Sequence, residues 1–130
     1  MKIKKSSLFN KKILVGITGG ISAYKSIFLV RLLIQSGAQV KVVLSPSAHN
    51  FVSPLVLSVL SKNKVFSSFT NEEKTWNNHV ELGLWADLII IAPSTANTIS
   101  KLAYGICDNL LLAVVLSARC PIFIAPALDH

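Results

Sequence analysis

Short apolar segments rich in β-branched residues alternate along the chain with segments of helical periodicity, and this alternation constrains the fold more than any other feature. Apolar runs predict buried strands at residues 12–17, 40–44, 88–92 and 121–125. Helices are predicted between them, from residue 22 to a stop at Gly37, and over residues 54–60, 95–104 and 109–117. Because strand–helix–strand connections within a sheet leave the two strands parallel, the sequence predicts one α/β domain, a doubly wound parallel sheet in three layers.

Two stretches of this pattern are less regular. Ser22 stands at the start of the first predicted helix, where its hydroxyl is expected to cap the helix N-terminus. Residues 61–78 are polar and aromatic without a clear period, so they are predicted to be mostly loop.

The net charge of +7 is concentrated at the N-terminus. The five lysines among residues 1–12 leave eight basic and six acidic residues from residue 13 onward, a net charge of only +2. Residues 1–11 are therefore interpreted as a solvated basic leader and residues 12–130 as the domain, and no nucleic-acid partner is predicted. A nucleic-acid arm and a mitochondrial-type presequence are the less favoured interpretations of the leader.

The same composition argues against a membrane segment and against a metal site. The longest apolar run, Leu110 to Leu116, is far shorter than the roughly 18 to 20 residues of a membrane-spanning helix. Cys107 and Cys120 match neither a disulfide framework nor a metal-ligand spacing. These observations favour a reduced, cytoplasmic setting.

The segments that follow the four predicted strands are small, polar or proline-bearing. They are Thr18-Gly19-Gly20, Ser45-Pro46-Ser47, residues 93–97 and residues 126–129. Ligands of doubly wound sheets bind outside the carboxyl ends of the strands, where helix N-termini offer free N–H groups to an anion. The first loop has the spacing GxxGG rather than GxGxxG, which disfavours a dinucleotide. A phosphate-bearing ligand is therefore predicted at these strand ends.

Three motifs, in this order, carry a more specific signal: GITGGISAYK at residues 16–25, HVELGLWAD at residues 79–87 and APSTAN at residues 92–97. Together they resemble the flavin-containing cysteine decarboxylases over residues 12–130. Within that family the chain looks most like the branch that decarboxylates 4'-phosphopantothenoylcysteine to 4'-phosphopantetheine in coenzyme A biosynthesis. The resemblance implies a flavodoxin-like, Rossmann-type fold, an FMN cofactor, and trimers or multiples of trimers with the active site at a subunit boundary.

The resemblance also implies roles for individual residues. The FMN phosphate is expected to be surrounded by Gly19, Gly20, Ile21, Ser45 and Ser47. The flavin and its ribityl chain are expected to be lined by Phe51, Ser94, Thr95, Ala96 and Asn97. His79 falls on the catalytic histidine of the family, and Asp129 on a residue that addresses the carboxylate of the small-molecule thiol substrate.

Two departures from the family bear on turnover. Asp129 stands where the family has an asparagine, so a like charge is expected to face the substrate carboxylate. The family also continues beyond the position of His130 into a flap whose cysteine completes the reaction, so the C-terminal part of the family domain is expected to be missing and this chain to hold flavin with little turnover.

Two alternatives stay open at this point. One is an FMN-binding regulatory or subunit-binding protein without turnover. The other is a different flavoprotein of the same fold, such as a flavin prenyltransferase, although Gly19-Gly20-Ile21 resembles the decarboxylases more closely.

Overall fold

The computed structural model describes residues 7–67 and 72–126. Within these ranges the centre of the molecule is a sheet of four parallel strands in the order β2-β1-β3-β4. The strands are β1 (Lys12–Ile17), β2 (Gln39–Leu44), β3 (Leu88–Ser94) and β4 (Ile122–Pro126). From β1 the chain crosses to β2 at one edge of the sheet, and from β3 it crosses to β4 at the opposite edge. The topological switch point, where ligands of such sheets bind, therefore lies between β1 and β3.

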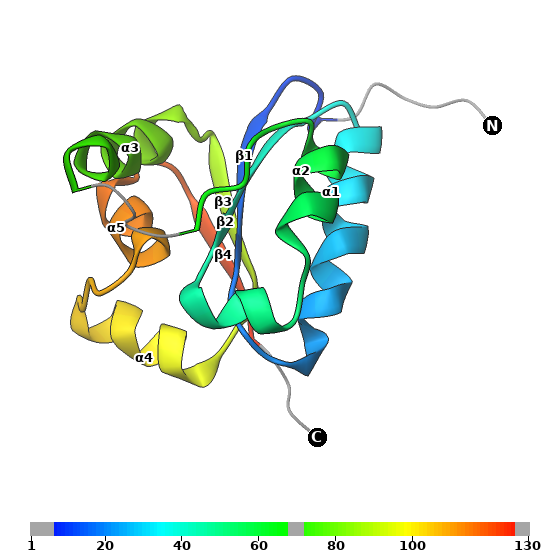
Figure 1. Ribbon diagram of the computed structural model, residues 1–130. Coiled ribbons are helices and arrows are strands. Elements are labelled where there is room, and N and C mark those ends of the chain that lie inside the picture. Colours follow the sequence, from blue (N-terminus) through cyan, green and yellow to red (C-terminus); the bar gives the residue numbers. More distant parts are fainter. Residues whose placement is uncertain (1–6, 68–71, 127–130) are drawn as a thin grey trace.

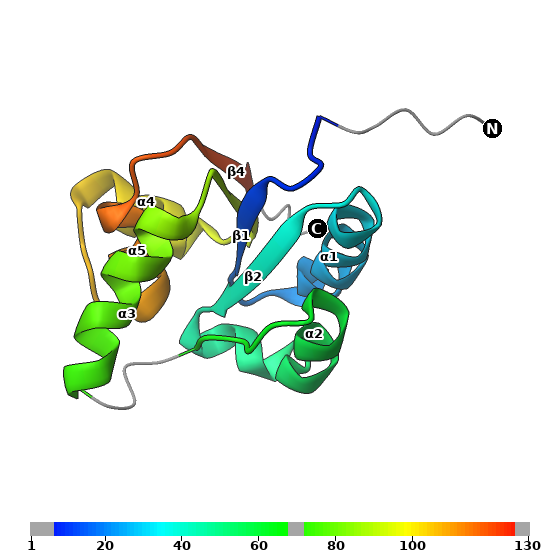
Figure 2. The same ribbon diagram turned by 90° about the horizontal axis from the view of Figure 1, so that it is seen from above.

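Helices cover both faces of the sheet (Figure 1, Figure 2). One face carries α1 (Lys25–Gln35) and α2 (Pro54–Ser61), and the other side carries α3 (Glu72–Trp85), α4 (Ala96–Tyr104) and α5 (Leu110–Ser117). Two short 3-10 helices, η1 (Ile21–Tyr24) and η2 (Pro46–Asn50), follow β1 and β2. In Figure 1 the strands run downward, so their carboxyl ends lie at the bottom, where α1 and α4 begin, whereas α3 lies at the top. The predicted doubly wound, three-layer architecture is confirmed.

Strands β1, β2 and β3 are buried on both faces of the sheet because alternate residues point into two separate cores, whereas β4 is mostly exposed. Val15 and Val42 pack with α1 and α2 residues such as Val30 and Leu57. Leu14, Val43, Ile89 and Ile91 pack on the other face with residues of α3 and α5, which include Leu82, Leu111 and Val114. Burial on both faces accounts for the nearly continuous apolar strand sequences from which the parallel sheet was predicted.

Two local predictions are wrong. Residues 72–78 are helical rather than loop, since α3 begins at Glu72. Glu72, Glu73 and Lys74 have high helix propensity, and the second half of α3 packs into the core on the other face of the sheet through Leu82 and Trp85. Ser22 does not cap a helix: it lies inside η1, Gly20 holds the cap position, and α1 begins only at Lys25.

Two other predictions fall on residues outside the described ranges. These are residues 1–6 of the basic leader and residues 127–130, which include Asp129. No helix within the described ranges is both long and apolar enough to cross a membrane.

Candidate functional site

A buried threonine joins the two loops that flank the switch point. Thr18 follows β1 and is 1% exposed. Its hydroxyl donates to the carbonyl oxygen of Pro93 at 2.7 Å and accepts from the N–H of Thr95 at 2.9 Å. Its own N–H donates to the same Pro93 carbonyl at 3.2 Å. Thr18 was predicted only as part of a small, polar strand end, and its hydrogen bonds to residues 93 and 95 were not predicted.

The glycine turn after β1 brings bare backbone against the loop after β2. A Cβ atom on Gly19 would lie 2.6 Å from Ser47 Oγ, so only glycine fits this approach without displacing Ser47. Gly20 has a φ of +126°, in the region that side chains with a Cβ rarely adopt. Ile21 follows with its side chain 79% exposed. Gly19 and Gly20 therefore expose main-chain atoms at the edge where the strands end.

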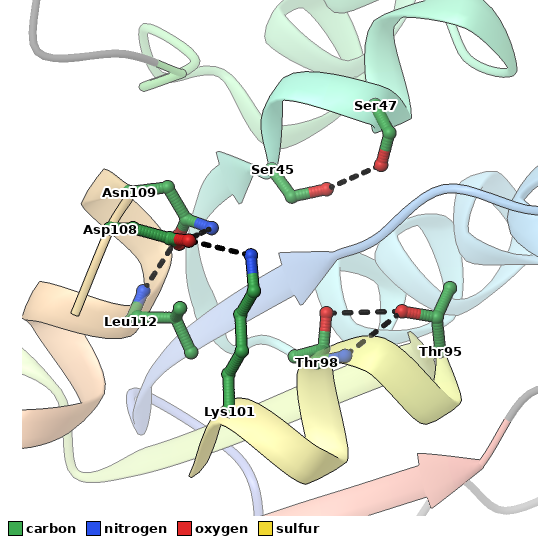
Figure 3. Close-up of polar contacts among 8 residues, drawn as sticks. All are labelled: Ser45, Ser47, Thr95, Thr98, Lys101, Asp108, Asn109 and Leu112. Carbon is green, nitrogen blue, oxygen red and sulfur yellow. Dashed lines mark hydrogen bonds and ion pairs between the residues drawn. The ribbon is translucent and has the colours of Figure 1, made fainter. Parts of the chain in front are cut away.

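The loop after β2 contributes two neighbouring hydroxyl groups. Ser45 is buried, and its N–H donates to the carbonyl oxygen of Ile17 at 2.9 Å. Its Oγ lies 3.3 Å from the Oγ of the exposed Ser47, close enough for a hydrogen bond (Figure 3). Phe51, just beyond η2, keeps 45% of its surface exposed. Ser45 and Ser47 line the polar pocket described below and Phe51 does not, but an exposed aromatic ring on the same loop suits a planar ligand.

The end of β3 holds a buried hydroxyl without a partner. Ser94 is fully buried, and its Oγ has no hydrogen-bond partner among the described residues. The next residue, Thr95, caps α4 by accepting from the N–H of Thr98 at 3.2 Å. Ala96 and Asn97 follow in the exposed first turn of α4. A buried hydroxyl without a partner destabilises a fold, so a ligand that hydrogen-bonds to Ser94 would remove that cost.

A polar pocket of about 260 Å³ opens between these segments. Residues from η2, α4 and the start of α5 line it: Ser45, Pro46, Ser47, Thr95, Asn97, Thr98, Lys101, Asp108 and Asn109. Lys101 Nζ pairs with Asp108 Oδ2 at 2.7 Å, and Asn109 Oδ1 accepts from the N–H of Leu112 at 3.0 Å, which caps α5 (Figure 3). Four of the predicted ligand residues, Ser45, Ser47, Thr95 and Asn97, therefore meet at one pocket. The Lys101–Asp108 pair was not predicted, because neither residue belongs to a strand end or a recognised motif.

A second pocket of about 270 Å³ lies on the other side of the switch point. The start of α1 and the ends of β3 and β4 line it, with Ser22, Lys25, Ser26, Leu29, Ala92, Pro93, Ala125 and Pro126. Its walls are mainly apolar, and the Oγ of Ser22 is buried without a partner among the described residues. Pro93 and Pro126 of the predicted strand-end segments line this pocket, but none of the residues assigned to FMN does, so the polar pocket matches the predicted cofactor site better.

His79 lies away from both pockets. It is 8% exposed and lies on α3 about one turn before the buried Leu82, on the same face of the helix. Figure 1 places α3 beside the end of the sheet where the strands begin, at the opposite end from the polar pocket. A single chain therefore does not bring His79 to the glycine turn.

The described ranges hold no group of three or more His, Cys, Asp or Glu residues placed to bind a metal ion. Cys120 lies just before β4, where burial raises the pKa of its thiol and the nearby Asp87 carboxylate raises it further. A thiol with a raised pKa is protonated at neutral pH and is a poor nucleophile.

Comparisons with known proteins show which proteins this chain resembles. The coenzyme A biosynthesis bifunctional protein CoaBC of Haemophilus influenzae is 47% identical over 124 residues, which are 95% of this chain and 31% of that protein. The chain thus spans about a third of the length of that relative.

Solved structures show the same fold. The FMN-dependent cysteine decarboxylase TvaF from thioviridamide biosynthesis superposes with a TM-score of 0.85 at 30% identity, covering 92% of this chain and 74% of that one. A mutant PPC decarboxylase complexed with pantothenoylaminoethenethiol superposes with a TM-score of 0.79 at 32% identity, covering 93% and 69%. The sequence profile of the Flavoprotein family matches residues 1–130, and this chain therefore belongs to that family.

Proposed function

We propose that this chain binds FMN at the carboxyl ends of its strands and decarboxylates 4'-phosphopantothenoylcysteine to 4'-phosphopantetheine. The main support for FMN binding is the fully buried hydroxyl of Ser94 at the switch point, which has no hydrogen-bond partner among the described residues. The neighbouring turn approaches Ser47 so closely that only glycine fits at position 19. The relatives support it, since PPC decarboxylase and TvaF are decarboxylases and TvaF is FMN-dependent by name.

The residues at the strand ends carry the chemical groups that FMN binding requires. The turn Gly19-Gly20-Ile21 and the hydroxyls of Ser45 and Ser47 would hold the phosphate, because main-chain N–H groups and hydroxyls are strong donors to an anion. Residues 94–97 would hold the ribityl chain, with the Ser94 hydroxyl gaining its missing partner. The half-exposed ring of Phe51 would pack against the flavin.

Decarboxylation of a cysteine derivative needs a place for the electrons of the departing carboxylate. When bound, FMN would supply a two-electron acceptor for oxidation of the thiol-bearing carbon. Carbon dioxide can then leave without the electron pair of the broken C–C bond, which is delocalised toward sulfur, and the same two electrons return from the cofactor when 4'-phosphopantetheine is formed. His79 would move or hold the proton, since an imidazole ring has one nitrogen that can donate a proton and one that can accept it. Asp129 would face the substrate carboxylate, where its like charge weakens binding compared with an asparagine.

The proposal includes a second copy of the chain. His79 is on α3 at one end of the sheet, whereas the polar pocket is at the other, so a site that uses both is completed between subunits. Threefold symmetry is the arrangement that the family resemblance implies. A cytoplasmic location fits a small-molecule thiol substrate and free cysteines, and neither a nucleic acid nor a membrane is a proposed partner.

The first test is FMN binding by the purified chain. We expect visible flavin absorbance to copurify or to be restored by added FMN, and the melting temperature to rise with FMN concentration, because a ligand of the folded state stabilises it. Gly20→Val should weaken binding, since valine strains a backbone with φ of +126° and places a side chain in the phosphate turn. If the wild-type chain is folded and its melting temperature does not change at saturating FMN, the proposal that FMN is the cofactor is wrong.

The second test is the reaction with 4'-phosphopantothenoylcysteine, with free cysteine as the competing substrate. We expect carbon dioxide release, in an amount that tests the sequence-based prediction of little turnover, and loss of visible flavin absorbance when substrate is added without oxygen. His79→Asn should abolish that loss of absorbance while leaving FMN affinity nearly unchanged, because the histidine is assigned to proton movement and not to FMN binding. Undiminished bleaching in His79→Asn would show that the histidine takes no part in the reaction. Reaction with free cysteine and not with 4'-phosphopantothenoylcysteine would show that the proposed substrate is wrong.

A further inference from the structure

Lys101 supplies the positive charge of the polar pocket. Among the described residues that line this pocket it is the one cation, and its side chain is only 26% exposed. The other donors there are neutral hydroxyls and amides. We propose that Lys101 is the counter-ion of a phosphomonoester bound in this pocket, and that Asp108 holds it in place until that ligand arrives.

The surroundings of Lys101 suit a phosphate more than any neutral ligand. Ser45 and Ser47 place two hydroxyls 3.3 Å apart in the same pocket. The N–H groups of Ala96 and Asn97 open the first turn of α4, where no intrahelical acceptor exists, and no hydrogen bond to them is formed within the described residues. Ser94, immediately before this turn, has a buried hydroxyl without a partner among the described residues, but it does not line the pocket. A dianion in such a pocket gains neutral donors from the loops, but it gains charge compensation only from Lys101.

Asp108 can release Lys101 at low cost. Its side chain is 50% exposed, so water can replace the ammonium group around Oδ2. Its Oδ1 already accepts from Asn109 Nδ2 at 3.3 Å, and it directly precedes the cap of α5, where the helix dipole favours a negative charge. The ion pair thus keeps the half-buried ammonium compensated in the free protein and leaves it available to a doubly charged phosphate.

This inference rests on the proposed function, because phosphomonoesters occur both in FMN and in the proposed substrate. The cofactor is tested by the ratio of the dissociation constants of riboflavin and FMN, measured from flavin fluorescence with the full chain. Lys101→Gln should lower this ratio by about tenfold, as expected for loss of one charge-assisted hydrogen bond. Arg31→Gln, which removes one exposed positive charge of α1, is the matched control and should leave the ratio unchanged.

Salt dependence gives an independent readout. The FMN dissociation constant of the wild type should rise with ionic strength more steeply than that of Lys101→Gln, because a charge pair is screened and a neutral contact is not. Riboflavin binding should show the same weak salt dependence in both proteins.

A second arm identifies the substrate as the source of the phosphate. If Lys101→Gln leaves the flavin ratio unchanged but raises KM about tenfold for 4'-phosphopantothenoylcysteine and not for its dephosphorylated form, the pocket binds the substrate phosphate. If neither the flavin ratio nor the two KM values change, Lys101 is not a phosphate counter-ion and the inference is wrong. A folded wild-type chain that binds no flavin at all would instead overturn the proposed function.

Discussion

At the scale of single residues, the hydroxyl of Thr18 does more to place the site than any predicted ligand residue. It connects the loop after β1 to the end of β3 through a donated and an accepted hydrogen bond. The glycine turn and the first turn of α4 therefore have a fixed relative position before any ligand binds. Preorganised donors of this kind lose little free energy to reordering when an anion arrives.

Thr18→Val tests this positioning role, because valine keeps the shape of threonine and removes the hydroxyl. Leaving the Thr95 N–H without its acceptor should lower the free energy of unfolding by about 1–2 kcal/mol. It should also weaken FMN binding by about tenfold in protein that is still folded. Fluorescence titration and thermal unfolding measure the two effects separately.

Thr18→Ser is the control, since it keeps the hydroxyl and loses only a methyl group. We expect its FMN affinity to stay close to that of the wild type. A valine variant with lowered stability but unchanged FMN affinity would show that Thr18 supports the fold alone.

At the scale of elements, the N-terminus of α5 links the polar pocket to the second core. Asn109 caps α5 through the N–H of Leu112, while Leu110, Leu111 and Val114 of the same helix are buried beneath the sheet. The residue before the cap, Asp108, holds Lys101. The cap therefore sets where the charged pair stands relative to the core.

Asn109→Ala should lower the free energy of unfolding by about 1 kcal/mol, because the N–H of Leu112 loses its acceptor. Asn109→Ser, which retains a capping oxygen, should recover most of this loss. Chemical denaturation of both variants measures the difference. Equal stability of the alanine and serine variants would mean that the cap contributes nothing to α5.

Local sequence patterns predicted the strands and their ends because each depends on a few consecutive residues. Lys12–Ile17 and Leu88–Ser94 are apolar runs that stop at small or polar residues, so the elements, their parallel arrangement and the edge that carries the site could all be predicted. The start of α3 was missed because its first turns lack an apolar period. The Lys101–Asp108 pair and the hydrogen bonds of Thr18 were missed because they join residues whose closeness only the folded chain creates.

At the scale of the whole molecule, the two groups of predicted functional residues lie at opposite ends of the sheet. The glycine turn is at the carboxyl ends of the strands, and α3, which carries His79, is beside their beginnings (Figure 1). No side-chain movement carries a residue on a packed helix across the length of a sheet. A reaction that needs both groups therefore takes them from two copies of the chain.

Mixing two inactive variants tests this arrangement. Gly20→Val lacks the phosphate turn and keeps His79, whereas His79→Asn keeps the turn and lacks the histidine. If each site combines the turn of one subunit with the histidine of the next, random assembly of equal amounts should restore about a quarter of the sites, each with one intact turn and one intact histidine. Coexpression of the two variants followed by measurement of carbon dioxide release gives the recovered fraction. Activity that stays at the level of the separate variants, in mixed oligomers that do form, would place the turn and the histidine of each site in one chain or remove one of them from the reaction.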